Sequence, residues 1–203
     1  KLASFKTGKS RVIAFNNSFH GRTSAAVAVT DNPFINAPIN RQQKVTFLPL
    51  NNSDLVTDEL KKGDVAAVII EGIQGVGGLD EGTTAFFKEL EKACQKRGVF
   101  LILDEVQSGY GRSGEFFAFQ HHHIKPDIIT TAKGMGNGFP IGGVLISNKI
   151  EPKFGMLGTT FGGNHLACTA AISVLEIMES ENLIAHVNEV SNYFLKQIKP
   201  ISQ

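Results

Sequence analysis

Six short runs of apolar, β-branched residues recur along the chain and predict six β-strands. They cover residues 11–15, 44–49, 65–71, 99–104, 127–131 and 142–147. The runs 65–71 and 99–104 are almost continuously apolar, which is typical of strands buried on both faces of a parallel sheet.

The helical spacing of apolar residues predicts a helix over 83–96, between the third and fourth predicted strands, with Gly98 as its stop signal. A strand, a helix and a strand joined by short links imply a right-handed βαβ unit. We therefore expect an α/β fold with a mostly parallel central sheet flanked by helices. Two further helices are predicted over 164–178 and 183–198, and residues 1–5 have the pattern of the end of an amphipathic helix.

The composition is that of an ordinary globular domain, with 203 residues, 42% of them hydrophobic and 19% charged. The 20 basic and 19 acidic residues leave a formal charge of +1 without a basic tract, so we expect neither a nucleic acid nor a membrane as partner. No apolar run approaches the roughly 18 residues of a membrane helix. The two cysteines, Cys94 and Cys168, lack metal-ligand spacing and suit a cytoplasmic location.

Reactive side chains follow three of the predicted strands. Glu71 and Asp104 end two of them, and Lys133 follows another after Ala132. In open α/β sheets, ligands bind beyond the carboxyl ends of the strands. Burying an acidic group there is costly unless a base or a hydrogen-bond donor meets it, and a cationic cofactor nitrogen would do so.

Lys133 lies between an apolar strand and the glycine-rich loop 134–138. A lysine that attacks a carbonyl must be neutral, and burial beside a cationic or polar group makes it so. The alternative is a solvated lysine before a turn. Asp104 either caps a turn at its strand end or pairs with a protonated pyridine nitrogen, which makes the ring an electron sink. The combination of Lys133 and Asp104 on two strand ends favours a shared site.

Two further segments offer groups that bind ligands. Phe19 and Arg22 follow the first strand. Phe19 either stacks on a flat ring or fills the core, and Arg22 either binds a carboxylate or faces solvent. Thr159 and Thr160 precede a predicted helix, where hydroxyl and backbone N–H groups bind phosphate or cap the helix. Three consecutive histidines at 121–123 point in different directions on any regular element, so we expect no metal there.

Five motifs, in order and at plausible spacing, resemble the class III, fold-type-I aminotransferases that depend on pyridoxal 5′-phosphate (PLP), and among them the acetylornithine group. The motifs are FHGRT at 19–23, EGIQGVGG at 71–78, LDEVQSGYGRSGEFFAF at 103–119, KPDIITTAKGMGNGFPIGG at 125–143 and GTTFGGNHLAC at 158–168. They span most of the chain.

The resemblance implies a PLP site. Lys133 would bind the cofactor as a Schiff base and later carry the proton between substrate and cofactor. Asp104 would pair with the pyridine nitrogen, and Gln107 would hydrogen-bond the phenolic oxygen. Val106 and Phe19 would contact the two faces of the ring.

The resemblance also implies residues around the ring. His20 would lie near the cofactor, and Thr160 would bind the phosphate of the cofactor held by the other subunit of a homodimer. Arg22 and Thr159 would bind the substrate, Arg22 through its α-carboxylate. Glu71 would face the substrate pocket.

Two residues depart from the family pattern. Val76 stands where many relatives have a glutamate that helps the site switch between its two substrates. His165 stands where proline is usual. We expect residues 1–203 to be a segment of the PLP-binding large domain, with an N-terminal segment and a C-terminal small domain lying outside it.

The implied reaction is transamination of N2-acetyl-L-ornithine with 2-oxoglutarate, which gives N-acetyl-L-glutamate 5-semialdehyde and L-glutamate in arginine biosynthesis. Aminotransferases that act on N-succinylornithine, ornithine or 4-aminobutyrate are the nearest alternatives. An aminomutase of the same fold would need no external keto acid. A domain that keeps the fold only to bind a partner would not need Lys133, Asp104 and Gln107 together.

Overall fold

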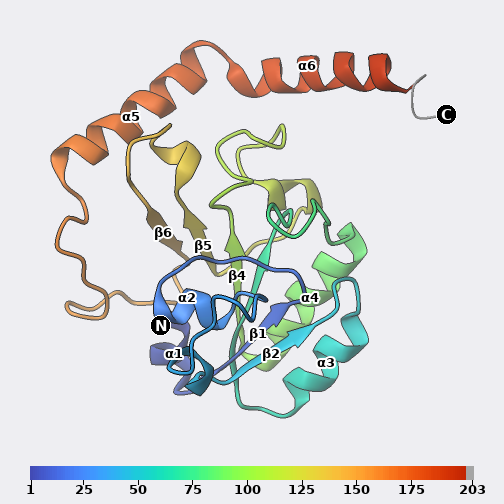
Figure 1. The fold of residues 1–203 in the computed structure, drawn as a ribbon, viewed down its shortest axis with the longest axis vertical. Coiled ribbons are helices and arrows are strands. Elements are labelled where there is room, and N and C mark those ends of the chain that lie inside the picture. The colour runs from blue at the N-terminus through green and yellow to red at the C-terminus, as the bar shows by residue number, and fades with distance from the viewer. Residues whose placement is uncertain (200–203) are drawn as a thin grey trace.

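One six-stranded sheet with the strand order β2-β1-β3-β4-β5-β6 forms the centre of the computed structural model, which describes residues 1–199 (Figure 1). The strands are β1 (Arg11–Phe15), β2 (Val45–Leu48), β3 (Val65–Glu71), β4 (Phe100–Asp104), β5 (Ile128–Thr131) and β6 (Gly143–Ile146). Neighbouring strands are parallel except β6, which is antiparallel to β5. Each strand lies within a predicted run, so the mostly parallel α/β fold is confirmed.

Residues 1–199 also form six α-helices and three short 3-10 helices. The α-helices are α1 (Leu2–Thr7), α2 (Ser24–Ala28), α3 (Ser53–Lys61), α4 (Thr84–Arg97), α5 (His165–Ser180) and α6 (Leu183–Ile198); the 3-10 helices are η1 (Asn40–Gln42), η2 (Ala118–His122) and η3 (Lys133–Met135). The predictions of α4, α5 and α6 are confirmed to within two residues. As expected, α4 ends at Gly98, whose left-handed φ of 62° suits glycine.

The helices α3 and α4 cover one face of the sheet and enclose the main core. Most of this core comes from β1, β3 and β4 and from the apolar faces of the two helices: Ile13, Phe15, Val65, Val68, Ile70, Leu101, Leu103, Val56, Leu60, Phe86, Phe87, Leu90 and Cys94. Fully burying each large side chain of this kind contributes roughly 1.5–3 kcal/mol. The main core therefore fixes the positions at which β1, β3 and β4 end.

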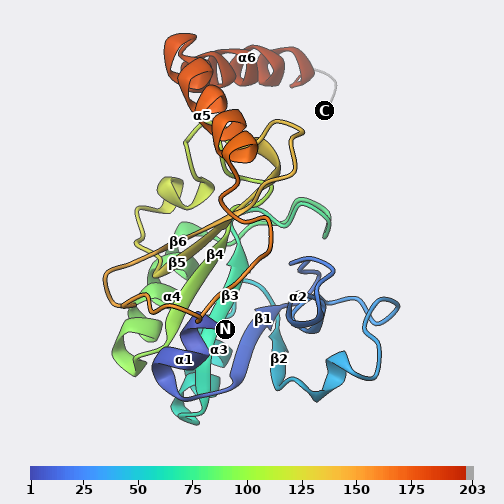
Figure 2. The ribbon, with the colours of Figure 1, turned by 90° about the vertical axis from the view of Figure 1, so that its left-hand side faces the viewer.

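The opposite face carries α1 and α2, and Figure 2 shows α2 and α4 on opposite sides of the sheet. Ala67, Phe100 and Ile128 pack there against Leu2 and Ala3 of α1. All of β3 is buried except the half-buried Ile69. The prediction of strands buried on both faces is confirmed for β3.

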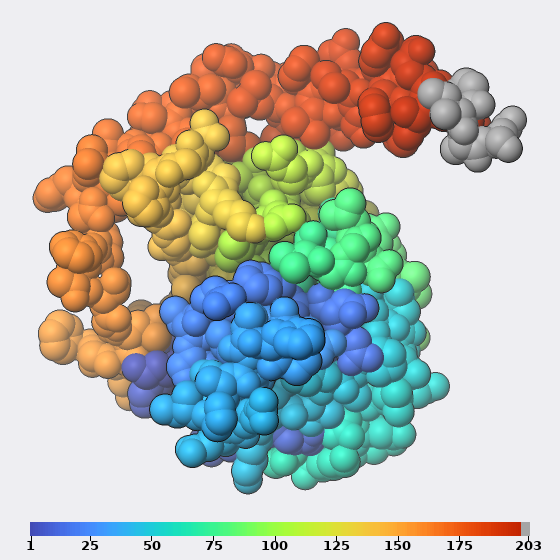
Figure 3. All heavy atoms as spheres, viewed as in Figure 1, coloured from blue at the N-terminus to red at the C-terminus, as the bar shows by residue number. Residues whose placement is uncertain are grey.

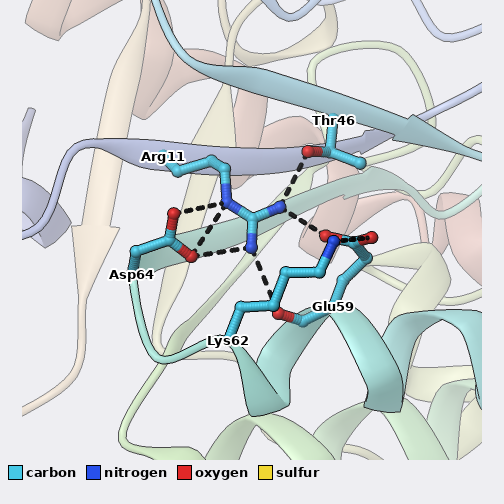
Figure 4. A network of polar contacts seen from close by, with 5 residues as sticks. All are labelled: Arg11, Thr46, Glu59, Lys62 and Asp64. Carbon is cyan, nitrogen blue, oxygen red and sulfur yellow. Dashed lines mark hydrogen bonds and ion pairs between the residues drawn. The ribbon is translucent and has the colours of Figure 1, made fainter.

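A charged network joins β1, β2 and α3 at the amino end of the sheet (Figure 4). The Arg11 guanidinium donates to both carboxylate oxygens of Asp64, to Glu59 Oε2 at 2.6 Å and to the Thr46 hydroxyl at 2.8 Å. Lys62 donates to the other oxygen of Glu59. Buried Arg11 thus has an acceptor for each of its nitrogens.

The helices α5 and α6 extend away from the sheet (Figure 1), and Figure 3 shows the segment before α5 arching away from the body of the molecule. No residue of α6 is buried among the described residues. Asn188 of α6 donates to the Gly114 carbonyl oxygen at 2.9 Å, which attaches the helix to the loop after β4. Within residues 1–199, each helix is too short or too polar to cross a membrane.

Candidate active site

The loops after β1, β3, β4 and β5 enclose one cavity at the carboxyl edge of the sheet. These strands are parallel, so their carboxyl ends meet at the same edge. The cavity is lined by Phe19, His20, Gly21, Glu71, Val76, Asp104, Val106, Gln107 and Lys133. The tertiary structure therefore brings together most of the site residues predicted from the sequence.

Lys133 is the first residue of η3, directly beyond β5. Its Nζ donates to Gln107 Oε1 at 2.5 Å, and its backbone has a positive φ of 39°. The residue is exposed, as in the alternative of a lysine before a turn, and it also lines the cavity. The following loop, 134–138, consists mostly of glycines, which have no side chains to cover the lysine.

Asp104 is buried at the end of β4 and has two hydrogen-bond donors. His20 Nδ1 lies 2.7 Å from its Oδ2, and the backbone N–H of Val106 donates to Oδ1 at 3.1 Å. The buried acid therefore has the partners that the sequence required. The bond from Val106 also confirms that Asp104 caps a turn, so the capping role and the site position occur together.

Glu71 joins two loops of the cavity. Its Oε1 accepts the backbone N–H of Phe19 at 2.9 Å, and its Oε2 accepts that of Gly75 at 3.1 Å. Burial raises the pKa of the Glu71 carboxyl, although both hydrogen bonds favour the ionised form. Glu71 lines the cavity as expected, and its two oxygens hold the loop of Phe19 and the loop of Val76 beside it.

Glu105 holds the long loop after β4, a role that sequence reasoning missed. It is 1% exposed and accepts hydrogen bonds from the Ser108 hydroxyl at 2.7 Å and from the backbone N–H groups of Ala118 and Phe119, each at 3.0 Å. Burial raises the pKa of the Glu105 carboxyl. Its place directly after a buried strand was the available signal, as for Asp104.

Gly75 is a second residue whose role sequence reasoning missed. Its backbone lies against the side-chain amide of Gln107, so closely that a Cβ atom at this position would overlap Gln107 Nε2. The absence of a side chain at Gly75 therefore allows Gln107 to reach Lys133. The sequence showed Gly75 only as one residue of the EGIQGVGG motif at 71–78.

Three predicted site residues lie outside the cavity lining. Arg22, Thr159 and Thr160 are exposed and are not among the described residues that line it. The alternative that the two threonines cap α5 is wrong, because the Asn164 side chain accepts the Ala167 N–H at 2.9 Å and is the cap. Their roles in binding substrate or phosphate stay predictions.

The histidine run has a packing role through its middle member. His122 is buried and stacks on Phe87, with ring centroids 4.2 Å apart, and its Nδ1 lies 3.0 Å from the Thr84 hydroxyl. In the part of the chain that the structure describes, no group of three His, Cys, Asp or Glu side chains could hold a metal ion. His122 thus joins η2 to the start of α4.

The side chains of the cavity suit a flat heteroaromatic cofactor. Phe19 and Val106 offer apolar surfaces, Asp104 a carboxylate for a ring nitrogen, Gln107 an amide and Lys133 a primary amine for a carbonyl. The buried Nε2 of His20 has no hydrogen-bond partner among the described residues. These groups fit the chemistry of PLP.

Known sequences similar to this chain are aminotransferases. The family model for class-III aminotransferases matches residues 1–203. The chain is 42% identical over 198 residues to the acetylornithine aminotransferase of Aquifex aeolicus, covering 96% of this chain and 52% of that protein. It is 40% identical over 210 residues to the succinylornithine transaminase of Photorhabdus laumondii, covering 100% of this chain and 52% of that protein. The chain thus spans about half the length of these curated relatives.

Solved structures of transaminases have the same fold. An ornithine aminotransferase from Toxoplasma gondii, with PLP in partial occupancy at its active site, superposes with a TM-score of 0.88 at 28% identity, over 98% of this chain and 50% of that chain. An S-selective transaminase from Arthrobacter sp. with alanine bound superposes with a TM-score of 0.90 at 25% identity, over 99% and 51%. The fold-type-I assignment is confirmed, and the chain belongs to the class-III aminotransferase family.

Proposed function

We propose that the cavity binds PLP and that Lys133 Nζ attaches it covalently. The observation that carries this proposal is the meeting of Lys133, Asp104 and Gln107, from two strand ends, in one cavity with Phe19 and Val106. When bound, the cofactor supplies an electron sink for a carbanion beside the substrate nitrogen.

The residues of the chain would orient the ring and move the proton. Asp104 would pair with the pyridine nitrogen, Phe19 and Val106 would contact the ring faces, and Gln107 would donate to the phenolic oxygen. The amine of Lys133 would be the group that holds and moves the proton at the substrate carbon. The hydrogen bond from Lys133 Nζ to Gln107 Oε1 supports this role, because it places the lysine amine beside the side chain that would bind the phenolic oxygen.

For the whole protein, we propose transamination of N2-acetyl-L-ornithine with 2-oxoglutarate, as in arginine biosynthesis. The terminal amino group of N2-acetyl-L-ornithine would be transferred to 2-oxoglutarate. The products would be N-acetyl-L-glutamate 5-semialdehyde and L-glutamate. Several relatives that are 36–42% identical to this chain bear the name acetylornithine aminotransferase, which supports this substrate. We propose that residues 1–203 form a segment of the PLP-binding large domain, since the chain spans about half of those relatives.

We also propose a homodimer in which Thr160 of one protomer binds the cofactor phosphate of the other, while Arg22 and Thr159 bind the substrate. The exposure of all three residues leaves them accessible to a ligand or a second copy. Phe154 and Phe161, on either side of the threonines, are 110% and 80% exposed, so this segment offers apolar surface for a contact.

Covalent attachment can be tested with PLP and borohydride on the complete protein. The visible absorbance band of bound PLP should disappear on reduction, and mass spectrometry should find the cofactor on the peptide with Lys133. The variant Lys133→Ala should lose the reducible band. As a matched control, Lys92→Ala changes an exposed lysine of α4 and should keep it. A Lys133→Ala protein that still formed the same band would refute the assignment.

N-succinylornithine is the second candidate substrate, because one relative that is 40% identical is named a succinylornithine transaminase. Steady-state kinetics with N-acetylornithine, N-succinylornithine, ornithine and 4-aminobutyrate would decide between them. We expect the highest kcat/KM for N-acetylornithine with 2-oxoglutarate. A higher value for the succinyl compound would change the substrate assignment, and turnover without any keto acid would indicate an aminomutase.

A further inference from the structure

The loop that follows β4 holds Lys133 at two points. Gln107 of this loop accepts the hydrogen bond from Lys133 Nζ. Tyr110, further along the same loop, packs against the backbone that follows the lysine, because a Cβ atom at Gly134 would lie only 3.0 Å from Tyr110 Cβ and 3.7 Å from its Cγ. The lysine is therefore held at its amine by Gln107 and at its backbone by Tyr110.

Left-handed backbones meet at this contact. Tyr110 has a φ of 57°, and Lys133, directly before Gly134, has a φ of 39°. Such values are uncommon for residues other than glycine, and bulky side chains rarely adopt them. Each destabilises the chain by about 1–3 kcal/mol and persists only where the surrounding structure fixes it. Two such residues side by side at the candidate catalytic lysine indicate that the contact has a role in the site.

Tyr110 is itself fixed from behind. The Gly111 N–H donates to the Phe116 carbonyl oxygen at 3.3 Å, and the ring of Phe116 packs on that of Tyr110, with centroids 5.0 Å apart. The Gly109 N–H donates at 3.1 Å to the carbonyl oxygen of buried Glu105, whose carboxylate binds the far end of the loop. Tyr110 is thus a firm support on which the η3 backbone rests.

We propose that Tyr110 is a positioning residue that acts through Gly134, supporting the backbone of η3 and so fixing where Lys133 Nζ lies relative to Gln107. The proposal rests on the proposed function, since it assumes that Lys133 binds PLP. Tyr110 is not among the described residues that line the cavity, and it need not touch cofactor or substrate. The support comes from its Cβ atom and its ring, not from its hydroxyl.

Three variants separate this role from simple packing. Tyr110→Phe keeps the Cβ atom and the ring and removes only the hydroxyl. Tyr110→Gly accepts the left-handed φ without strain but removes the Cβ atom on which Gly134 packs. The double variant Tyr110→Gly/Gly134→Ala places a Cβ atom on the other side of the same contact, where Tyr110 Cβ no longer obstructs it. His123→Gly is the matched control, because His123 is an exposed residue with a ring and a φ of 54°, outside the cavity lining.

Two measurements on the complete protein follow the lysine. Amide hydrogen exchange in residues 133–137, measured without PLP, reports how firmly η3 is held. The rate constant for covalent attachment of added PLP, followed by the visible absorbance band of the bound cofactor, reports the placement of Lys133 Nζ. Thermal unfolding verifies that each variant is folded.

We expect Tyr110→Phe and His123→Gly to behave as the wild type. Tyr110→Gly should exchange about two- to tenfold faster in residues 133–137 and attach PLP about 10- to 100-fold more slowly, the range for a reacting group that is misplaced. The double variant should recover most of both losses. Tyr110→Gly and the double variant lack the same ring, so a merely structural loss would affect them equally, whereas a positioning role predicts that the double variant recovers attachment.

The possible failures are distinguishable. If the wild type does not attach PLP at Lys133, the proposed function and this inference both fall. If the wild type attaches PLP and folded Tyr110→Gly matches it in exchange and in attachment rate, only the role of Tyr110 is refuted. The same holds if Tyr110→Phe or the double variant is as slow as Tyr110→Gly.

A single substitution keeps the test open if Tyr110→Gly does not fold. Gly134→Ala presses one Cβ atom against Tyr110 and should attach PLP about two- to tenfold more slowly than the wild type. Attachment at the rate of the wild type in Gly134→Ala would refute the role of Tyr110.

Discussion

The Nζ of Lys133 donates a hydrogen bond to Oε1 of Gln107 at 2.5 Å, across a sequence separation of 26 residues. The bond joins the residues that follow β5 and β4. The backbone of Lys133 has a left-handed φ of 39°, a conformation that destabilises a non-glycine residue by about 1–3 kcal/mol. Such strain at a lysine in a cavity suits a residue that is positioned for chemistry.

The contact of Gly75 with Gln107 predicts that Gly75→Ala weakens the site more than the fold. A Cβ at Gly75 would overlap Gln107 Nε2, so Gln107 must move away from Lys133. We expect the affinity for PLP and the rate of transamination to fall about tenfold, the equivalent of one hydrogen bond. Absorbance titration and steady-state kinetics measure these effects.

Gly142→Ala is the control for that substitution, since a Cβ there would meet its nearest atom, the Thr131 carbonyl oxygen, at 3.4 Å. It should leave both quantities unchanged. Equal effects of the two substitutions would show that added bulk, and not the Gln107 contact, is responsible.

The Arg11 network predicts a loss of stability in acid. Lys62 and Arg11 lower the pKa of Glu59, and Arg11 lowers the pKa of Asp64. A carboxyl with a lowered folded-state pKa stabilises the fold above its unfolded pKa of about 4, and this stabilisation is lost as pH falls through the folded value. We expect Arg11→Met to lower the free energy of unfolding by about 1–3 kcal/mol at pH 7 and to make it less dependent on pH below about 5.

Denaturant unfolding at pH 7 and at successively lower pH would measure this effect. Lys61→Met, which breaks the exposed ion pair between Lys61 and Asp58, should change the free energy of unfolding by less than about 1 kcal/mol. An Arg11→Met protein with the stability and acid response of the wild type would contradict the role of the network.

Burial lowers the pKa of His122, which predicts a second dependence on pH. A histidine with a lowered folded-state pKa stabilises the fold above its unfolded pKa of about 6.5, and this is lost as pH falls through the folded value. His122→Phe keeps the stack on Phe87 but has no proton to gain. It also loses the Thr84 hydrogen bond, which should cost about 0.5–1.5 kcal/mol at pH 7.5.

We expect the stability difference between wild type and His122→Phe to shrink as the pH is lowered below about 6.5. Thermal midpoints across this range would show it. His186→Phe, at an exposed position of α6, should show no such trend. A difference that stays constant with pH would contradict the proposed protonation of His122.

The bond from Asn188 to Gly114 predicts that α6 orders the loop that follows Gln107. Asn188→Ala should speed amide hydrogen exchange in residues 109–114 about two- to tenfold, the range for one neutral hydrogen bond. Asn192→Ala alters an exposed asparagine of the same helix and should leave exchange unchanged. Unaltered exchange in Asn188→Ala would mean that the loop is ordered without α6.

Local patterns predicted the elements with strong periodicity and failed where it was weak. The continuous apolar run of β3 and the helical spacing of α4 were recognised. The helix α3 was not, because Ser53–Lys61 contains only Leu55, Val56 and Leu60 as large apolar residues. It forms because Asn52 caps it and because Val56 and Leu60 are buried against the sheet.

The sequence by itself determined the strands, the α/β class, the family motifs and the strand ends at which Glu71, Asp104 and Lys133 stand. These follow from hydrophobic periodicity and residue type, which are local properties. Only the tertiary structure decided which groups meet: His20 with Asp104, 84 residues apart, Glu71 with two backbone N–H groups, and Lys133 with Gln107. Such pairings depend on the register of a parallel sheet and on loop geometry, which join distant segments and leave no periodic trace in the chain.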